Sequence, residues 1–121
     1  MPHFSDSLSE GLIPALRTAY NEASCPVRAL LLTNPHNPLG VRYSRVVLEA
    51  CLQLCQDLNI YFISDEVYAL TSFETDDIPF PIPFTSLLSL DVKGLGCDLW
   101  RAHTVWSTSK DFGQSGFRLV S

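Results

Sequence analysis

The sequence predicts an α/β fold with a mainly parallel sheet and crossover helices. Two short apolar runs, residues 27–33 and 60–64, lack the alternation of a half-exposed strand, which is typical of parallel strands covered on both faces. A helical pattern over 44–57 lies between these runs. The order strand, helix, strand is typical of a crossover that joins two parallel strands.

The first predicted helix covers residues 5–24, where apolar side chains recur at helical spacing. Either Ser7 or Ser9 could cap its start, and a glutamate three positions after Ser7 would complete a capping box. The helix should end near Cys25, because the proline that follows disfavours helical backbone. The helix over 44–57 has Ser44 as its N-cap, an apolar stripe that indicates a core face, and Asn59 as its end.

The third predicted strand covers residues 103–106, and another strand should begin within 117–121. The stretch between 71 and 101 is the least regular, with helical turns expected only within 85–90. A loop of this length in a compact domain is usually functional or covered by a partner. Its proline and aromatic segment, 73–84, fits a packed surface loop or a surface for proline-recognising modules.

Composition limits the classes of partner. The chain has 121 residues, enough for one domain, with 46% apolar residues and a net charge of −5. Without basic runs, we expect no nucleic-acid and no membrane partner. The four cysteines have no metal-site spacing and are interpreted as reduced, buried thiols, so no metal is expected. Because the start also lacks the pattern of a signal peptide, a cytoplasmic location is expected.

A lysine stands between hydroxyls and glycines in residues 107–118, directly after an apolar run. A strand that ends there would present the amine of Lys110 at the edge of a sheet, where a lysine can form a Schiff base with an aldehyde. The hydroxyls of Ser107 and Ser109 and the guanidinium of Arg118 are groups that hold a phosphate. Taken alone, the stretch also fits an ordinary surface turn.

Polar residues also follow the other two predicted strands. The turn 34–40 contains two Asn-Pro pairs, and the amide of Asn37 could meet a ring substituent of a ligand, although a plain tight loop fits as well. Asp65 follows an apolar strand, where its charge needs a cation unless it only caps the next turn. Tyr68 could turn back toward the same place. Glu66 is interpreted as solvent-facing or structural.

Three stretches together resemble a known family. They are Asn-Pro-His-Asn-Pro-Leu-Gly from residue 34, Ser-Asp-Glu-Val-Tyr from residue 64, and Ser-Lys-Asp-Phe-Gly-x-x-Gly-Phe-Arg from residue 109. In this order they resemble the large domain of class I/II aminotransferases, which are fold type I pyridoxal-phosphate enzymes. The residues of these motifs most resemble those of the aminocyclopropane-carboxylate synthase-like branch. The resemblance implies a partial large domain over 1–121, with its cofactor-binding core at 27–121 and the N-terminal segment and C-terminal small domain absent.

The resemblance also implies roles for single residues. Lys110 would form a Schiff base with pyridoxal 5'-phosphate and move the proton at the substrate's alpha carbon. Asp65 would pair with the protonated pyridine nitrogen, which keeps the ring an electron sink. Tyr68 and Asn37 would bind the phenolic oxygen of the ring. The phosphate would be held by Ser107, Ser109 and Arg118.

The resemblance therefore implies the cofactor-binding portion of an enzyme that acts on an amino acid by transamination or by alpha,gamma-elimination. The full-length parent would be a homodimer. An alternative is a non-catalytic truncated remnant that serves as an interaction or regulatory partner of a full-length paralogue. The intact lysine, aspartate and arginine favour the enzyme, and three motifs in order argue against an unrelated α/β binding module.

Overall fold

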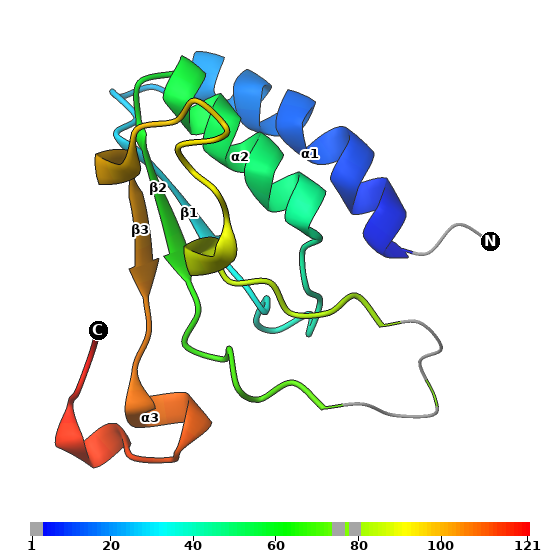
Figure 1. Cartoon of the computed structure of the whole chain (residues 1–121). Coiled ribbons are helices and arrows are strands. Elements are labelled where there is room, and N and C mark those ends of the chain that lie inside the picture. Colours follow the sequence, from blue (N-terminus) through cyan, green and yellow to red (C-terminus); the bar gives the residue numbers. More distant parts are fainter. Residues whose placement is uncertain (1–3, 74–76, 78–80) are drawn as a thin grey trace.

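Three parallel strands form a single sheet. The computed structural model describes residues 4–73, 77 and 81–121, in which the strands lie in the order β1-β2-β3 (Figure 1). Their bounds are β1 (Ala29–Thr33), β2 (Tyr61–Asp65) and β3 (Ala102–Val105). The predicted α/β class with a parallel sheet is confirmed.

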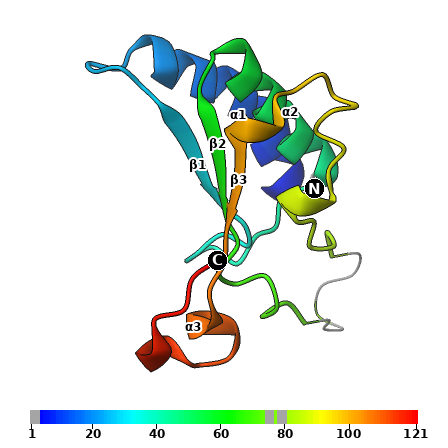
Figure 2. The same cartoon turned by 60° about the vertical axis from the view of Figure 1, so that its left-hand side comes forward.

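Two long helices cover the same face of this sheet (Figures 1 and 2). They are α1 (Phe4–Asn21), which precedes β1, and α2 (Arg45–Asp57), which joins β1 to β2. The remaining helical segments are short: η1 (Leu87–Ser89), η2 (Leu99–Arg101), α3 (Thr108–Asp111) and η3 (Ser115–Phe117). In the described part of the chain the connection from β2 to β3 contains no α-helix, so only one of the expected crossovers is helical.

Helix α2 forms as its sequence predicts. The backbone N–H of Val47 donates to the hydroxyl of Ser44, which confirms the predicted N-cap. Asn59 follows the helix with a positive φ of 57°, a left-handed conformation that asparagine tolerates at helix ends. The apolar stripe is buried and supplies five of the twelve buried residues of the core cluster: Val47, Leu48, Cys51, Leu52 and Cys55, beside Leu32, Ile60, Phe62, Leu87, Leu90, Val92 and Cys97.

Several predicted boundaries are wrong. Helix α1 begins at Phe4, so Ser7 and Ser9 lie inside it and neither caps its start. The predicted strand over 117–121 is only a single antiparallel bridge between Val120 and Ser107, because Phe117 belongs to η3. The strands themselves are displaced by one or two residues, and the helical turns expected within 85–90 are confirmed by η1. The proline and aromatic segment lies partly outside the described residues.

The expectation that both faces of the strands are covered is wrong for the described residues. Leu32 is 7% exposed on the face that α1 and α2 cover, whereas Leu31 on the other face is 60% exposed. Tyr61 and His103 also lie on that open face, where their rings are 5.6 Å apart. The apolar run therefore reflects two apolar faces, of which the elements described here cover one.

Three of the four cysteines are buried, as expected, but Cys25 is exposed. All four are free thiols. Burial raises the pKa of Cys51 to about 11 and that of Cys55 to about 12, so both stay protonated at neutral pH. The described residues contain no cluster of three potential metal ligands and no helix long and apolar enough to cross a bilayer.

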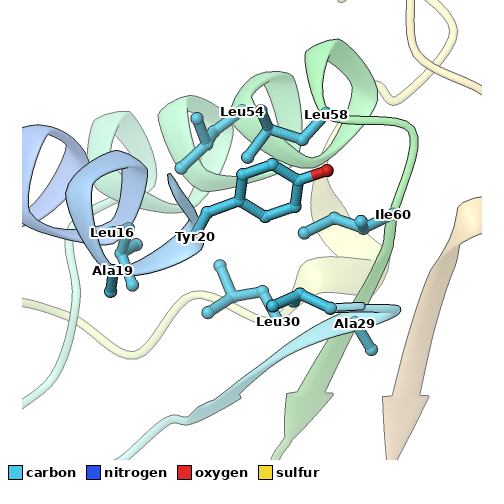
Figure 3. Close-up of a pocket in the computed structure, with 9 residues that line it drawn as sticks. Leu16, Ala19, Tyr20, Ala29, Leu30, Leu54, Leu58 and Ile60 are labelled. Atoms are coloured by element: carbon cyan, nitrogen blue, oxygen red, sulfur yellow. The ribbon is translucent and has the colours of Figure 1, made fainter. Parts of the chain in front are cut away.

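An apolar cavity of about 190 Å³ lies between the helices and the sheet (Figure 3). Its lining comes from α1, α2 and the first residues of the strands: Leu16, Ala19, Tyr20, Val27, Ala29, Leu30, Leu54, Leu58 and Ile60. Because open α/β sheets bind ligands at the carboxyl ends of their strands, this cavity at the amino ends is a gap in packing.

Candidate functional site

The carboxyl ends of all three strands meet at one edge of the sheet, where α3 also lies (Figures 1 and 2). Backbone hydrogen bonds join the residues just past the strands. The N–H of Asn34 donates to the carbonyl oxygen of Asp65 at 2.9 Å, and the N–H of Glu66 donates to that of Val105 at 2.8 Å. The motifs that follow the three strands are therefore brought to the same edge, as their positions predict.

Asn37 and Tyr68 line the same hollow. Its volume is about 220 Å³, and its lining is Pro35, His36, Asn37, Pro38, Gly40, Tyr68 and Thr71. The turn that carries Asn37 is closed because the N–H of Gly40 donates to the carbonyl oxygen of His36 at 2.8 Å. Gly40 has a positive φ of 64°, which a side chain would strain. Asn37 and Tyr68 therefore border one hollow, and what their side chains bind there stays a prediction.

Asp65 is the last residue of β2 and is half-buried. One carboxylate oxygen accepts a hydrogen bond from the N–H of Val67 at 3.3 Å, which is the turn-capping role weighed from sequence. The other oxygen has no hydrogen-bond partner among the described residues, so it is available to a cation. Together, Asn37, Asp65 and Tyr68 are called the ring half of the site.

Lys110 lies in the single turn of α3 with an exposed side chain. Ser107 is 6% exposed, and its hydroxyl accepts the N–H of Ser109 at 3.4 Å, so it caps this turn. Asp111 accepts the indole N–H of Trp106 at 2.6 Å and the backbone N–H of Leu70 at 3.2 Å. The second of these bonds joins α3 to the segment after β2. Residues 107–118 are called the lysine half.

Arg118 ends the lysine half in a left-handed conformation with a φ of 54°. Its guanidinium is exposed and donates to the carbonyl oxygen of Ser115 at 3.1 Å. In the described residues no hydrogen bond or ion pair joins Arg118 to Lys110, Ser107 or Ser109. The grouping of these side chains around a phosphate stays a prediction.

Three polar residues that were not among the predicted site residues connect the segments at this edge of the sheet. Asn34 is fully buried and Glu66 is 3% exposed, so the solvent-facing option for Glu66 is wrong and the structural one is confirmed. Asp111 makes the two bonds just described. Glu66 and Asp111 stand directly beside the predicted site residues Asp65 and Lys110, which was the only available signal. Their partners are too distant in sequence to be inferred.

The side chains at this edge include groups that could bind an aldehyde, a ring nitrogen and a phenolic oxygen. An exposed amine, a carboxylate with a free oxygen and a hollow with an amide and a phenol are all present. Two buried polar atoms, Oγ1 of Thr108 and Nδ1 of His36, have no hydrogen-bond partner in the part of the chain described. Oγ1 of Thr104 and Oδ1 of Asp111 are also buried without a partner there, although buried polar groups are normally paired.

Comparisons with known proteins show a family match over most of the chain. Residues 9–120 match the profile of the family "Aminotransferase class I and II". A probable aminotransferase, aclI of Aspergillus oryzae, is 57% identical over 115 residues, which cover 95% of this chain and 27% of the relative. The 1-aminocyclopropane-1-carboxylate synthase of Malus domestica is 39% identical over 113 residues, which cover 87% of this chain and 22% of that enzyme.

A solved structure has the same arrangement of elements. The aspartate aminotransferase of Thermotoga maritima superposes with a TM-score of 0.67 at 30% identity, and the match covers 93% of this chain and 27% of that one. The chain thus spans about a quarter of the length of the relatives it matches.

Proposed function

Because this chain belongs to the class I and II aminotransferase family, we propose that it is the pyridoxal-phosphate-binding portion of an aminotransferase or aminocyclopropane-carboxylate synthase-like enzyme. The observation that carries the proposal is the shared edge of the sheet. The segments that follow the three parallel strands carry a hollow lined by Asn37 and Tyr68, the half-buried carboxylate of Asp65 and the exposed amine of Lys110. Each of these groups is chemically complementary to one part of the cofactor.

The ring half would orient the cofactor. When bound, pyridoxal phosphate supplies an electron-withdrawing ring that stabilises negative charge at the alpha carbon of an amino acid. The free oxygen of Asp65 would hold the positive charge of the pyridine nitrogen, since a carboxylate beside a cation favours the charged form. Asn37 and Tyr68, which line one hollow, would bind the phenolic oxygen and fix the rotation of the ring.

The lysine half would anchor the cofactor and move the proton. The exposed amine of Lys110 can bond to the aldehyde, and once free it can take a proton from the alpha carbon of an amino acid substrate. Ser107, Ser109 and Arg118 would hold the phosphate. Transamination and alpha,gamma-elimination both need these groups, so the proposal covers either reaction of an amino acid.

The proposal also covers the domain to which the chain belongs, its oligomeric state and its location in the cell. Residues 1–121 would form part of a large domain with its cofactor-binding core at 27–121, in keeping with the profile match over 9–120. The full-length parent would be a homodimer. Free buried thiols suit a reducing compartment, and we place the enzyme in the cytoplasm.

The proposal is tested by trapping the cofactor on the chain. Purified protein is mixed with pyridoxal phosphate, reduced with borohydride, digested and mapped by mass spectrometry. The reduced adduct should lie on Lys110 and be lost in Lys110→Ala. The matched control is Lys93→Ala, which removes the only other lysine of the chain and should leave the adduct unchanged. Labelling shared between Lys93 and the terminal amine, and unaffected by Lys110→Ala, would overturn the proposal.

A further inference from the structure

Two buried polar side chains stand beside the ring half. The buried polar and charged residues are Asn34, Ser64, Glu66 and Ser107, and the first three flank the ends of β1 and β2. A buried carboxylate is costly unless donors surround it. The hydrogen-bond partners of Glu66 and Asn34 therefore indicate the role of these two buried side chains.

The carboxylate of Glu66 accepts three hydrogen bonds. One oxygen accepts the hydroxyl of Ser64 at 2.9 Å and the backbone N–H of Leu87 at 2.8 Å, and the other accepts the hydroxyl of Ser86 at 2.6 Å. Hydrogen bonds to a charged acceptor are stronger than neutral ones. Glu66 thus fastens the start of η1 to the end of β2, across about twenty residues of sequence.

Asn34 reaches the same segment from β1. Its side-chain amide donates to the carbonyl oxygen of Thr85 at 3.0 Å, and its side-chain oxygen accepts the N–H of Tyr43 at 3.2 Å. Its backbone N–H donates to Asp65 at 2.9 Å. Segment 85–87 is therefore clamped to two neighbouring strands, and we call Asn34, Glu66 and their partners in 85–87 the strand-end clamp.

The ring half lies between the anchor points of this clamp. Asn37 belongs to the turn whose two ends, Asn34 and Tyr43, are hydrogen-bonded to each other. Tyr68 belongs to the turn in which the N–H of Ala69 donates to the carbonyl oxygen of Glu66 at 2.9 Å. Asp65 directly precedes Glu66. Because side chains alternate along a strand, Asp65 points away from the face on which Ser64 and Glu66 are buried.

We propose that Glu66, together with Asn34, is a positioning residue: the strand-end clamp fixes the backbone that presents Asn37, Asp65 and Tyr68 to the cofactor. This inference rests on the proposed function. Glu66 acts through the backbone and does not itself touch the cofactor, since its carboxylate is occupied by three donors on the covered face. A charged acceptor serves better than a neutral one because all three partners donate.

The test compares Glu66→Leu and Glu66→Gln with Leu54→Ala in the full chain. Leu54 is 3% exposed on α2 and lies away from the carboxyl ends of the strands, so its truncation lowers stability without touching the clamp. The first measurement is of amide chemical shifts and hydrogen exchange at Asn37, Asp65 and Tyr68 by NMR. Glu66→Leu should change the chemical shifts of these amides and speed their hydrogen exchange. In Glu66→Gln the shifts and the exchange rates should stay close to those of the parent chain. Leu54→Ala should change neither the shifts nor the exchange rates of these three amides.

The second measurement is the dissociation constant for pyridoxal phosphate, followed by absorbance. Losing the clamp should weaken binding by about tenfold or more in Glu66→Leu, since the buried donors lose their acceptor. Glu66→Gln and Leu54→Ala should stay within about threefold of the parent chain. If Glu66→Leu leaves the three amides unchanged, or matches Leu54→Ala in both measurements, the positioning role is wrong. A parent chain that fails to bind the cofactor overturns the proposed function alone, because the NMR comparison still decides the clamp.

Discussion

The ring half and the lysine half lie at the same edge of the sheet but are held in different ways. The ring half is fixed by a strand-end clamp whose two side chains are almost completely buried. The lysine half consists of two short helical turns, α3 and η3, and the residues around them, in which Lys110 and Arg118 are exposed. The difference suits the proposed roles. A ring must be held in one orientation, whereas a lysine that forms and releases a covalent bond needs an accessible amine.

Of the substitutions that compare the two halves, removing the clamp from the β1 side should give the largest effect on stability. Asn34→Leu leaves the N–H of Tyr43 and the carbonyl oxygen of Thr85 without partners, at a cost of about 2–4 kcal/mol. The free energy of unfolding in urea measures it. Ser109→Ala, in the lysine half, removes a hydroxyl that makes no hydrogen bond in the described residues and should cost less than about 0.5 kcal/mol. If Asn34→Leu and Ser109→Ala lowered the free energy of unfolding equally, the two halves would not differ in how they are held.

Alkaline pH should loosen the core beneath both halves. The folded-state pKa values of Cys51 and Cys55, about 11 and about 12, lie above the ordinary value of 9.0. Their contribution to stability is therefore complete below about pH 9 and is lost as pH rises through the folded values, by about 1.4 kcal/mol per pH unit for each thiol.

Urea unfolding at pH 8 to 11 measures this slope, and the double variant Cys51→Ala, Cys55→Ala should flatten it. A thiol reagent at pH 8 should modify one group in the folded chain, the exposed Cys25. Rapid modification of all four thiols in the folded state would mean that the core is open.

Asp111→Ala tests how the lysine half is attached. The variant removes the acceptor of Trp106 and Leu70, at a cost of about 1–2 kcal/mol. Its effect should be local: tryptophan fluorescence and hydrogen exchange should change around α3, while amides of β1 and β2 keep their protection. Asp91→Ala is the control, because Asp91 is exposed and its side chain accepts, among the described residues, only the N–H of nearby Gly94. Loss of protection in the whole sheet would show that the lysine half supports the fold itself.

Filling the apolar cavity should give the smallest effect. Val27→Ile adds one methylene to the lining of this cavity, and burying it should stabilise the chain by about 0.8 kcal/mol. Thermal unfolding measures the gain. The dissociation constant for pyridoxal phosphate should not change, because the cavity lies at the amino ends of the strands. A changed dissociation constant for pyridoxal phosphate would mean that the cavity and the proposed cofactor site are not independent.

Local signals in the sequence predicted the elements whose causes are local. Ser44 and the apolar stripe placed α2 to within a residue, because capping and periodicity act over a few positions. Strand ends were less accurate, since pairing with a neighbour decides where a strand stops. Cys25 was expected to be buried, yet it lies in the exposed link between α1 and β1.

The order of the three motifs predicted which residues meet at the edge of the sheet. Sequence could not predict the clamp, because the partners of Glu66 in 85–87 lie some twenty residues away. It also could not predict that Asp111 binds Leu70, about forty residues earlier. These contacts depend on how the chain returns past the strand ends, and no local pattern encodes that path.

The central claim is that the two halves form one cofactor site, and titration of the labelled chain with pyridoxal phosphate tests it most directly. Amide shifts are followed by NMR across the whole chain. The account predicts saturable shifts at Asn37, Asp65, Tyr68 and Lys110 with a single common dissociation constant. Shifts confined to Lys110 and Lys93, without saturation and without any change in the ring half, would contradict it.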